Sequence, residues 1–518
     1  MNDFVSALKN EADSLFPNVS VTENGAIGRK TTGKSLLDLN FALSSMRNMK
    51  DDEIWDRFLF AYNEDPLLAV LWMFFARDRE EGCGERRTFR VIFERFCSEN
   101  PDDAIKLLHL IPFYGRWDDV VEVVFGHVPC KVRDEAIELL RMQIQSDILM
   151  ANTKQPVSIL AKWMPSGNTS SKETRRRAEF LRNAFGWAPK QYRKNISGLR
   201  RRINVVEQPM SANKWDTIDY EKVPSRAAMN YREAFDRHDH KRYAKYISDV
   251  KEGKAKINSS VLFPYDIVHA YGTYYLAQYN DTLEAQWKAL PNKVPENGST
   301  LVVVDGSGSM SSSVGDTGVT CHNVAQSLAV YFSEKLSDPF KNTFITFSSN
   351  PRLIHFDDDL SLRARLAILR EYTEISNTNI ERVFQLVLDT AVKNHLKQEE
   401  IPANILILSD MEFDMATYRN GWEYPAEESG PVDQTLFDTI AKRWEAAGYK
   451  LPRLVFWNIC SRTETIPVTT NELGVALVSG FSPSIADMVM SSELDPYKCL
   501  TNKLMSDRYI PVRSALKE

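Results

Sequence analysis

The stretch from Leu301 to Ser309 reads LVVVDGSGS and carries the clearest fold signal in the sequence. Its first four residues are apolar and mostly β-branched, which predicts a short strand buried on both faces. One carboxylate, Asp305, and two hydroxyls, Ser307 and Ser309, follow on a loop that two glycines allow to turn tightly. Open α/β sheets place their ligands at the carboxyl ends of their strands, so this loop is a candidate binding site.

The residues that follow repeat an alternation of strand and helix. Such alternation predicts a parallel sheet covered by helices, and we assign residues 300–518 to a doubly wound, Rossmann-like α/β domain. Residues 291–299 contain two prolines and an Asn-Gly pair, and we interpret them as the linker before this domain. The predicted strands are 301–304, 344–347, 405–408 and 454–457, and the predicted helices are 323–336, 380–395 and 434–447.

Two further oxygen donors occur later in this domain. Thr378 precedes a predicted helix, and Asp410 follows the third apolar run. Together with Asp305, Ser307 and Ser309 they form a set of carboxylates and hydroxyls without His or Cys, which favours Mg²⁺ or another hard divalent cation. Few carboxylates reach the ion, so its residual charge should attract an anion, either a carboxylate or a phosphate. No general base is placed beside these residues, so we interpret the site as binding and not catalytic.

This constellation of DxSxS, an isolated Thr and a later Asp resembles the metal-ion-dependent adhesion site of von Willebrand factor A domains. The resemblance implies that Ser307 and Ser309 bind the metal directly. Thr378 would join them directly or through water. Asp305 and Asp410 would supply charge, often through water.

The chain departs from that family after the last aspartate. The family commonly has Gly there, whereas this sequence continues as MEFD at 411–414, so Glu412 or Asp414 could neutralise the metal or fill its open position. A structural alternative keeps the fold but assigns Ser307 and Asp410 to hydrogen bonds within the loops.

The N-terminal part of the chain has a different pattern. From about residue 51 to residue 146 the apolar residues recur at helical spacing, and we assign residues 1–290 to an all-helical domain. Asp65-Pro66 and Asn100-Pro101 begin similar segments 35 residues apart, and each Pro suits the first turn of a helix. A period in the thirties is typical of an α-solenoid, although ordinary helical domains produce similar echoes.

Residues 172–256 differ from the rest in charge. They contain 22 Lys and Arg against 11 Asp and Glu, a net charge of +11, which leaves −17 for the remainder of the chain. Basic side chains neutralise phosphates and aromatic rings stack on unpaired bases, so this segment is a candidate RNA-binding surface. The alternative is a solvated face that docks on the acidic remainder. The interleaved aromatics are Phe180, Phe185, Trp187 and Tyr192, and the predicted RNA contacts are Arg175, Arg176, Arg177, Arg182, Lys190, Arg193, Lys194, Arg200, Arg201 and Arg202.

Residues 28–35 read GRKTTGKS and satisfy the GxxxxGK[ST] pattern of P-loop nucleotide-binding sites. In that pattern Lys34 would reach the phosphates and Ser35 a Mg²⁺ ion. The pattern has this meaning only after a buried strand of a parallel sheet, whereas residues 18–26 are polar and broken by glycine. We therefore interpret the segment as a loop that starts a helix, and keep a P-loop NTPase as the leading enzymatic alternative.

The order of a helical region, a basic segment and a domain with an intact metal motif resembles the Ro autoantigen and its TROVE-module relatives. It resembles more closely a poorly characterised Ro-like family of domain-of-unknown-function proteins. The resemblance implies a ring or horseshoe of HEAT-like repeats, closed by the A domain, that binds structured RNAs and the single-stranded ends of defective RNAs. The motifs that carry it are YGRWDD at 114–119, MSA with WD at 210–216, KVPSR at 222–226 and GKAKIN at 253–258.

By analogy, the protein would act as a scaffold or as a tether to a nuclease in RNA quality control or maturation. The longest apolar stretch, residues 67–76, falls short of the ~20 residues that cross a bilayer, and the N-terminus lacks a secretory pattern. The six cysteines show no zinc spacing. We expect a cytoplasmic RNA-binding protein that is not an enzyme, with an acidic protein or nuclease as a further partner and no membrane contact. A protein-only adaptor acting through the metal site is the second hypothesis.

Overall fold

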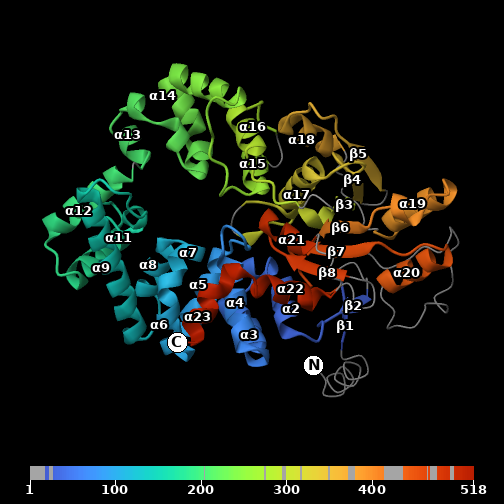
Figure 1. Cartoon of the computed structure of the whole chain (residues 1–518), viewed down its shortest axis with the longest axis horizontal. Coiled ribbons are helices and arrows are strands. Elements are labelled where there is room, and N and C mark those ends of the chain that lie inside the picture. The colour runs from blue at the N-terminus through green and yellow to red at the C-terminus, as the bar shows by residue number, and fades with distance from the viewer. Residues whose placement is uncertain are drawn as a thin grey trace, which may run out of the picture.

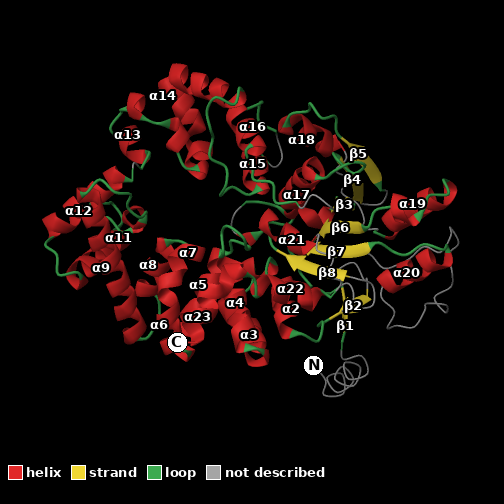
Figure 2. Ribbon diagram, in the orientation of Figure 1, coloured by secondary structure: helices red, strands yellow, loops and turns green. Residues whose placement is uncertain are grey.

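The computed structural model describes residues 18–22, 27–203, 205–272, 276–294, 299–315, 318–347, 351–371, 380–413, 436–463, 465–466, 475–489 and 495–517. The molecule is a mixed α/β protein with an N-terminal helical region and a C-terminal sheet (Figures 1 and 2). The order of a helical region and then a sheet agrees with the sequence prediction, but the region predicted to be all-helical also contains an antiparallel pair of short strands within residues 19–29. Thr378, Asp414 and the linker residues 295–298 lie outside the described residues.

The helical region is built from helices of 4 to 27 residues, and some of their starts follow sequence signals. The two predicted proline starts are confirmed, and the Asp65 side chain caps its helix by accepting a hydrogen bond from the Leu68 N–H at 2.9 Å. No helix in the described ranges combines the length and apolar character needed to cross a membrane. After the antiparallel pair β1 (Val19–Val21) and β2 (Ile27–Arg29), the helices are α2 (Ser35–Phe41), α3 (Asp51–Glu64), α4 (Pro66–Arg77), α5 (Arg86–Glu99), α6 (Pro101–Leu107), α7 (Ile111–Tyr114), α8 (Trp117–Phe125), α9 (Cys130–Asn152), α10 (Leu160–Trp163), α11 (Lys172–Ala184), α12 (Pro189–Arg202), α13 (Glu207–Ser211), α14 (Ser225–Lys251), α15 (Pro264–Ala270) and α16 (Asp281–Lys288).

The YGRWDD motif forms the turn between α7 and α8, and this turn contains a buried group of ion pairs. Asp119 is 1% exposed and accepts hydrogen bonds from Arg77 and Arg90, each at 2.8 Å, and from the Arg116 N–H at 3.0 Å. Gly115 lies against this carboxylate, and a Cβ there would come within 2.5 Å of an Asp119 oxygen. The motif is therefore explained by packing and charge balance within the helical region.

The C-terminal sheet has six strands in the order β5-β4-β3-β6-β7-β8. All neighbouring strands are parallel except the edge pair of β4 and β5. Every residue of β3 and β7 is buried, so both faces of the central sheet are covered. The strands are β3 (Thr300–Asp305), β4 (Thr343–Phe347), β5 (Arg352–His355), β6 (Asn404–Ser409), β7 (Arg453–Asn458) and β8 (Val475–Ser479), and the helices are α17 (Cys321–Lys335), α18 (Leu362–Glu371), α19 (Glu381–Lys393), α20 (Leu436–Ala446), α21 (Ala486–Val489), α22 (Pro496–Leu504) and α23 (Ile510–Lys517).

The four predicted strands are confirmed as β3, β4, β6 and β7, and the predicted helices of this domain as α17, α19 and α20. β5 and β8 were not predicted from the sequence. β5 is a four-residue edge strand whose Leu353 is 63% exposed, so it lacks the buried apolar run that marks the other strands.

The helical region contacts the sheet domain at both of its ends, so the chain follows a closed arc (Figure 1). At one end the Ser44 and Ser479 hydroxyls lie 2.7 Å apart, and Asn458 donates to the Phe41 carbonyl at 2.9 Å. At the other end, Trp287 of α16 donates to Glu334 of α17 at 2.8 Å. The arc is thus held against the sheet by polar contacts far apart in sequence.

The last helices return to the beginning of the chain. α22 and α23 pack on α4 and α6. Arg508 donates to both carboxylate oxygens of Asp78 at 2.8 Å, and the Tyr509 ring stacks on Tyr114 with centroids 5.6 Å apart. In space, residues 495–517 therefore extend the helical region, although they follow the sheet in sequence.

Candidate metal and anion site

The DxSxS loop lies where the strand order of the sheet reverses. From β3 the chain moves outward to β4 and then returns across β3 to β6, so β3 and β6 are parallel neighbours with Val304 opposite Leu408. Residues that follow these two strands meet in the crevice where α/β sheets commonly bind ligands. Asp305 is the last residue of β3 and Asp410 directly follows β6, so both carboxylates lie at this edge of the sheet.

The serine loop is held by its own backbone and hydroxyls. The Gly306 N–H donates to the Phe347 carbonyl at 2.7 Å, and a Cβ on Gly306 would lie 3.3 Å from that oxygen. The Ser307 N–H donates to Asp305 at 2.9 Å, and the Ser307 and Ser309 hydroxyls lie 2.9 Å apart. The two hydroxyls are therefore paired at the position that the sequence predicts for metal ligands.

Both carboxylate oxygens of Asp305 accept hydrogen bonds. One accepts the Ser307 N–H, and the other accepts the Ser409 hydroxyl at 2.6 Å. Ser409 is the last residue of β6 and was not predicted as a site residue, although it directly precedes the predicted Asp410. Because its oxygens are engaged, Asp305 is suited to supply charge at short range.

Asp410 differs from Asp305 in having an unsatisfied oxygen. It is 1% exposed, and its Oδ2 accepts no hydrogen bond from any residue that the structure describes. Burial and the charge of Asp305 raise the pKa of Asp410 to about 7, although the Ser309 hydroxyl and the charge of Arg462 oppose this rise. Two neighbouring buried carboxylates that disfavour each other's ionisation are stabilised by a cation between them.

The residues present fit a hard divalent cation. Ser307, Ser309 and the free oxygen of Asp410 are oxygen donors from adjacent strand ends, and a buried carboxylate oxygen without a hydrogen bond is a donor available to a metal. No cluster of three or more His, Cys, Asp or Glu occurs among the described residues, so the donor set is poor in charge and rich in hydroxyls. The fifth predicted ligand, Thr378, lies outside the described residues.

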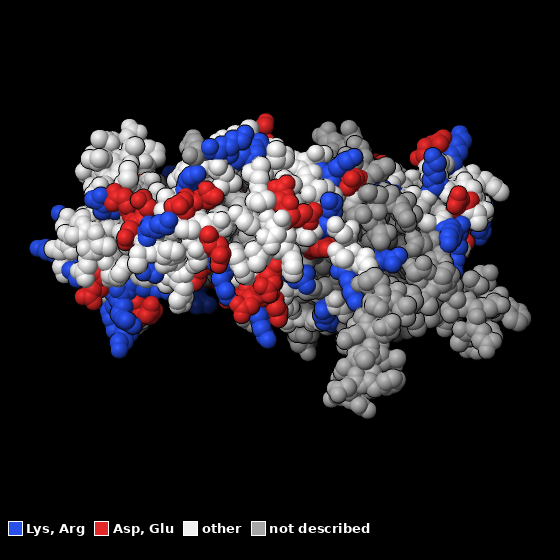
Figure 3. Space-filling view, turned by 90° about the horizontal axis from the view of Figure 1, so that it is seen from below, with Lys and Arg blue, Asp and Glu red and all other residues white. Residues whose placement is uncertain are grey.

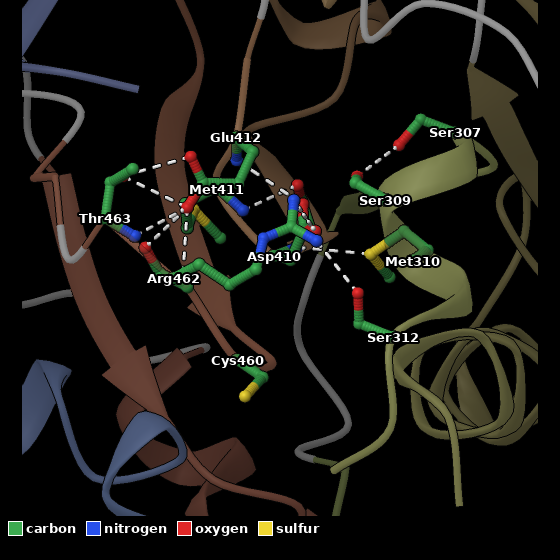
Figure 4. A network of polar contacts seen from close by, with 12 residues as sticks. Ser307, Ser309, Met310, Ser312, Asp410, Met411, Glu412, Cys460, Arg462 and Thr463 are labelled. Carbon is green, nitrogen blue, oxygen red and sulfur yellow. Dashed lines mark hydrogen bonds and ion pairs between the residues drawn. The ribbon is translucent and has the colours of Figure 1, made fainter. Parts of the chain in front are cut away.

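Glu412 does not point toward the serine loop. Its carboxylate is fully buried and accepts hydrogen bonds from the loop after β7: from the Arg462 and Thr463 N–H groups at 2.9 Å, the Thr463 hydroxyl at 3.0 Å and the Ser461 hydroxyl at 3.1 Å (Figure 4). The carboxylate expected to compete for the metal is thus engaged in holding a neighbouring loop.

Two further residues near the loop were not identified from the sequence. Arg462 forms an ion pair at 3.5 Å with the Asp410 Oδ2, the oxygen that accepts no hydrogen bond from described residues, and donates to the Ser312 hydroxyl at 2.8 Å. His322, at the start of α17, hydrogen-bonds the backbone of Gly306, and burial lowers the pKa of His322 to about 4. A neutral imidazole therefore contacts the loop without adding charge to the site.

The ten predicted RNA contacts separate into two groups. Arg200 donates to the Ala161 and Met164 carbonyls and to Ser166, and Arg177 pairs with Glu122 and Glu173. Arg182 pairs with Glu179, and Arg175 and Arg202 bond backbone carbonyls. These five have structural partners. The side chains of five others are exposed and make no hydrogen bond or ion pair to any described residue: Arg176, Lys190, Arg193, Lys194 and Arg201.

Three of the four unpaired cations of α12 form a stripe. Lys190, Lys194 and Arg201 fall within about 40° of one another around the helix axis and span about 16 Å along it. α14 carries three more exposed cations without described partners, Arg237, Lys241 and Lys245, which the sequence analysis did not single out. Acidic and basic side chains intermingle elsewhere, as Figure 3 shows for one face. The available positive charge is therefore local.

The aromatics of the basic segment mostly serve packing. Phe185 and Tyr192 are buried, and the half-buried Trp187 contacts both, with ring centroids 5.3 and 6.3 Å away. Phe180 is the exposed member of the set, at 44%. The basic segment thus offers more exposed side chains for contacts with phosphate than for stacking on bases.

The GRKTTGKS segment is arranged as a helix start. β2 pairs antiparallel with β1, and Lys34 is the residue before α2. Glu64 accepts a hydrogen bond from the Ser35 N–H at 2.7 Å and forms an ion pair with Lys34 at 3.5 Å. The Thr32 hydroxyl donates to the Asp38 carboxylate at 2.7 Å. A carboxylate thus takes the position that a phosphate would take in a P-loop, which favours the interpretation as a loop that starts a helix.

Comparison with known proteins identifies two matching families and a relative, none of which has a described activity. Residues 299–504 match a family described as a domain of unknown function (DUF7788), and residues 166–300 match a second one (DUF2828). The uncharacterized protein L728 of Acanthamoeba polyphaga mimivirus is 27% identical over 511 residues, which cover 92% of this chain and 85% of that protein. The similarity thus extends across both the helical region and the sheet domain.

Proposed function

We propose that this protein is a cytoplasmic, Ro-like RNA-binding scaffold in which helical repeats of HEAT type carry the RNA. The single observation that supports RNA binding best is the unpaired cationic stripe Lys190, Lys194 and Arg201 on α12. Structural arginines find partners within a folded chain, whereas three aligned cations without acids match the repeated charges of a polyphosphate backbone.

We further propose that the sheet domain is of von Willebrand factor A type and binds Mg²⁺. Its support is the reversal of strand order at β3, the antiparallel edge strand β5, and the free oxygen of Asp410 beside two paired hydroxyls. Ser307, Ser309 and Asp410 would hold the ion, with Asp305 supplying charge. When bound, the ion would supply an open coordination position for an anionic group of a partner; the role is binding without catalysis.

RNA binding through phosphates makes affinity strongly dependent on salt. Each phosphate contact to a single strand contributes about −0.7 to the slope of log affinity against log salt, so contact with the α12 stripe alone gives a slope of about −2. Fluorescence anisotropy of a labelled single-stranded RNA measures this slope when the affinity is determined at several salt concentrations between about 50 and 200 mM. Affinity that does not change with salt would contradict the proposal.

The metal site is tested by removing its donors. Ser307→Ala with Asp410→Ala should weaken binding of Mn²⁺, a spectroscopic substitute for Mg²⁺, by at least about 100-fold, because a hydroxyl and the free carboxylate oxygen are lost. Isothermal titration calorimetry measures the metal affinity. Asp389→Ala, on the exposed surface of α19, is the control and should change nothing. RNA affinity should stay the same in both variants, since the α12 stripe is untouched.

A protein-only adaptor is the second candidate. The observation that favours it is that half of the predicted RNA contacts, Arg177 and Arg200 among them, are engaged within the fold. In that case the first test fails and the second succeeds, so the two experiments separate the candidates.

A further inference from the structure

Arg462 is a cation in direct contact with the candidate metal site. It lies on the loop after β7, its side chain is 35% exposed, and one guanidinium nitrogen lies 3.5 Å from the Asp410 Oδ2 while another donates to Ser312 at 2.8 Å (Figure 4). The Asp410 oxygen concerned accepts no hydrogen bond from any described residue. The contact is therefore a loose ion pair on the atom that a metal would take.

The position of Arg462 is fixed by its backbone. The N–H groups of Arg462 and Thr463 both donate to Glu412 at 2.9 Å, and Glu412 lies two residues beyond Asp410 on the segment that follows β6. One segment thus presents the metal donor Asp410 and, through the fully buried Glu412, holds the loop that carries Arg462. The backbone is anchored by these two hydrogen bonds, and the guanidinium, on a side chain that is 35% exposed, is the part of the residue that contacts Asp410 and Ser312.

A metal ion and a guanidinium cannot share the same carboxylate oxygen without strong repulsion. When a divalent cation binds Asp410, the Arg462 guanidinium must leave that oxygen. Because its backbone is held by Glu412, Arg462 would stay beside Asp410, where it could meet a ligand of the ion. There it adds a second positive group that faces the same ligand.

We propose that Arg462 neutralises Asp410 in the metal-free protein and, in the metal-loaded protein, binds a phosphate monoester held at the open position of the metal. The inference rests on the metal site of the proposed function and names its ligand. A phosphate monoester has three terminal oxygens, so one can bind the metal while two meet the planar guanidinium. A carboxylate that gives one oxygen to the metal has only one left, so it gains less from Arg462.

The proposal predicts opposite changes in two affinities for Arg462→Gln. Mn²⁺ binding without added anion should become tighter by about 5-fold, because a competing half-exposed cation is gone. Binding of inorganic phosphate to the Mn²⁺-loaded protein should weaken by at least about 10-fold, because charge-assisted hydrogen bonds are lost. Calorimetry measures both, and acetate binding should change less than phosphate binding.

Two further variants control the experiment. Arg462→Lys keeps the charge but not the planar fork, so Mn²⁺ affinity should stay close to that of the natural protein while phosphate binding weakens. Arg95→Gln removes an exposed arginine paired with Asp52 in the helical region and should change neither affinity. A nucleoside 5′-monophosphate and phosphoserine, compared as ligands, distinguish a nucleic-acid end from a phosphoprotein as the source of the phosphate.

The outcomes separate this inference from the proposed function. If the natural protein does not bind Mn²⁺, the metal site itself fails, and the inference with it. If it binds Mn²⁺ but Arg462→Gln leaves both affinities unchanged, or weakens both, the inference alone is overturned. Acetate binding as tightly as phosphate to the loaded protein would overturn the choice of phosphate.

Discussion

Reversing the charge of the α12 stripe should weaken binding of single-stranded RNA by about 100-fold or more near physiological salt. In the triple variant Lys190→Glu, Lys194→Glu and Arg201→Glu, three cations without described partners become anions facing the phosphates. The fold should be unaffected, because these side chains are exposed and no described residue depends on them. The slope of affinity against salt should also fall in magnitude by about 2, since three phosphate contacts are lost.

A matched control separates local contact from the change in net charge. Lys393→Glu, Lys397→Glu and Lys450→Glu change the total charge by the same amount on exposed positions of the sheet domain. This variant should bind RNA as the natural protein does. Equal weakening in the two triple variants would mean that no specific surface on α12 is involved, and an unchanged affinity in the α12 variant would remove the stripe from the proposed function.

Replacing Asp119 by Asn should destabilise the helical region by about 3–5 kcal/mol. Asn has the same shape but no charge, so Arg77, which is 2% exposed, loses its buried counter-ion and Arg90 loses a partner. The uncompensated charge in a buried position accounts for most of the cost. The midpoint of urea unfolding, followed by circular dichroism at helical wavelengths, measures the loss.

The control for this prediction is an ion pair of the same chemistry at the surface. Asp52→Asn breaks the pair with Arg95, whose two side chains are 80% and 48% exposed, and should leave the unfolding midpoint where it is. A similar midpoint in Asp119→Asn and the natural protein would show that the buried cluster does not stabilise the turn between α7 and α8.

The sequence alone was sufficient for the elements whose signal is local. The central strands read as unbroken apolar runs because both their faces are buried, and Pro66 and Pro101 mark helix starts because proline suits only the first turn. The DxSxS loop was also placed correctly at the end of β3, because it directly follows the apolar run that forms this strand.

Features that depend on distant contacts could not be predicted in this way. Nothing in the order of residues indicates that Arg177 pairs with Glu122 while Arg176 stays unpaired, because that depends on how α11 packs on α8. Arg462 reaches Asp410 only because β6 and β7 are neighbours in the sheet. Charge density in the sequence therefore overestimated the number of unpaired cations by about a factor of two, since five of the ten predicted contacts are engaged within the fold.

The packing of α22 and α23 on α4 and α6 has a consequence for biosynthesis. Asp78 and its partner Arg508 are 430 residues apart in the chain, so the N-terminal helices leave the ribosome long before the helices that cover them. Their apolar faces stay open while the rest of the polypeptide is made, and the arc is completed by a late, long-range docking step. We therefore expect this apolar surface to be open to aggregation, and accessible to chaperones, during translation.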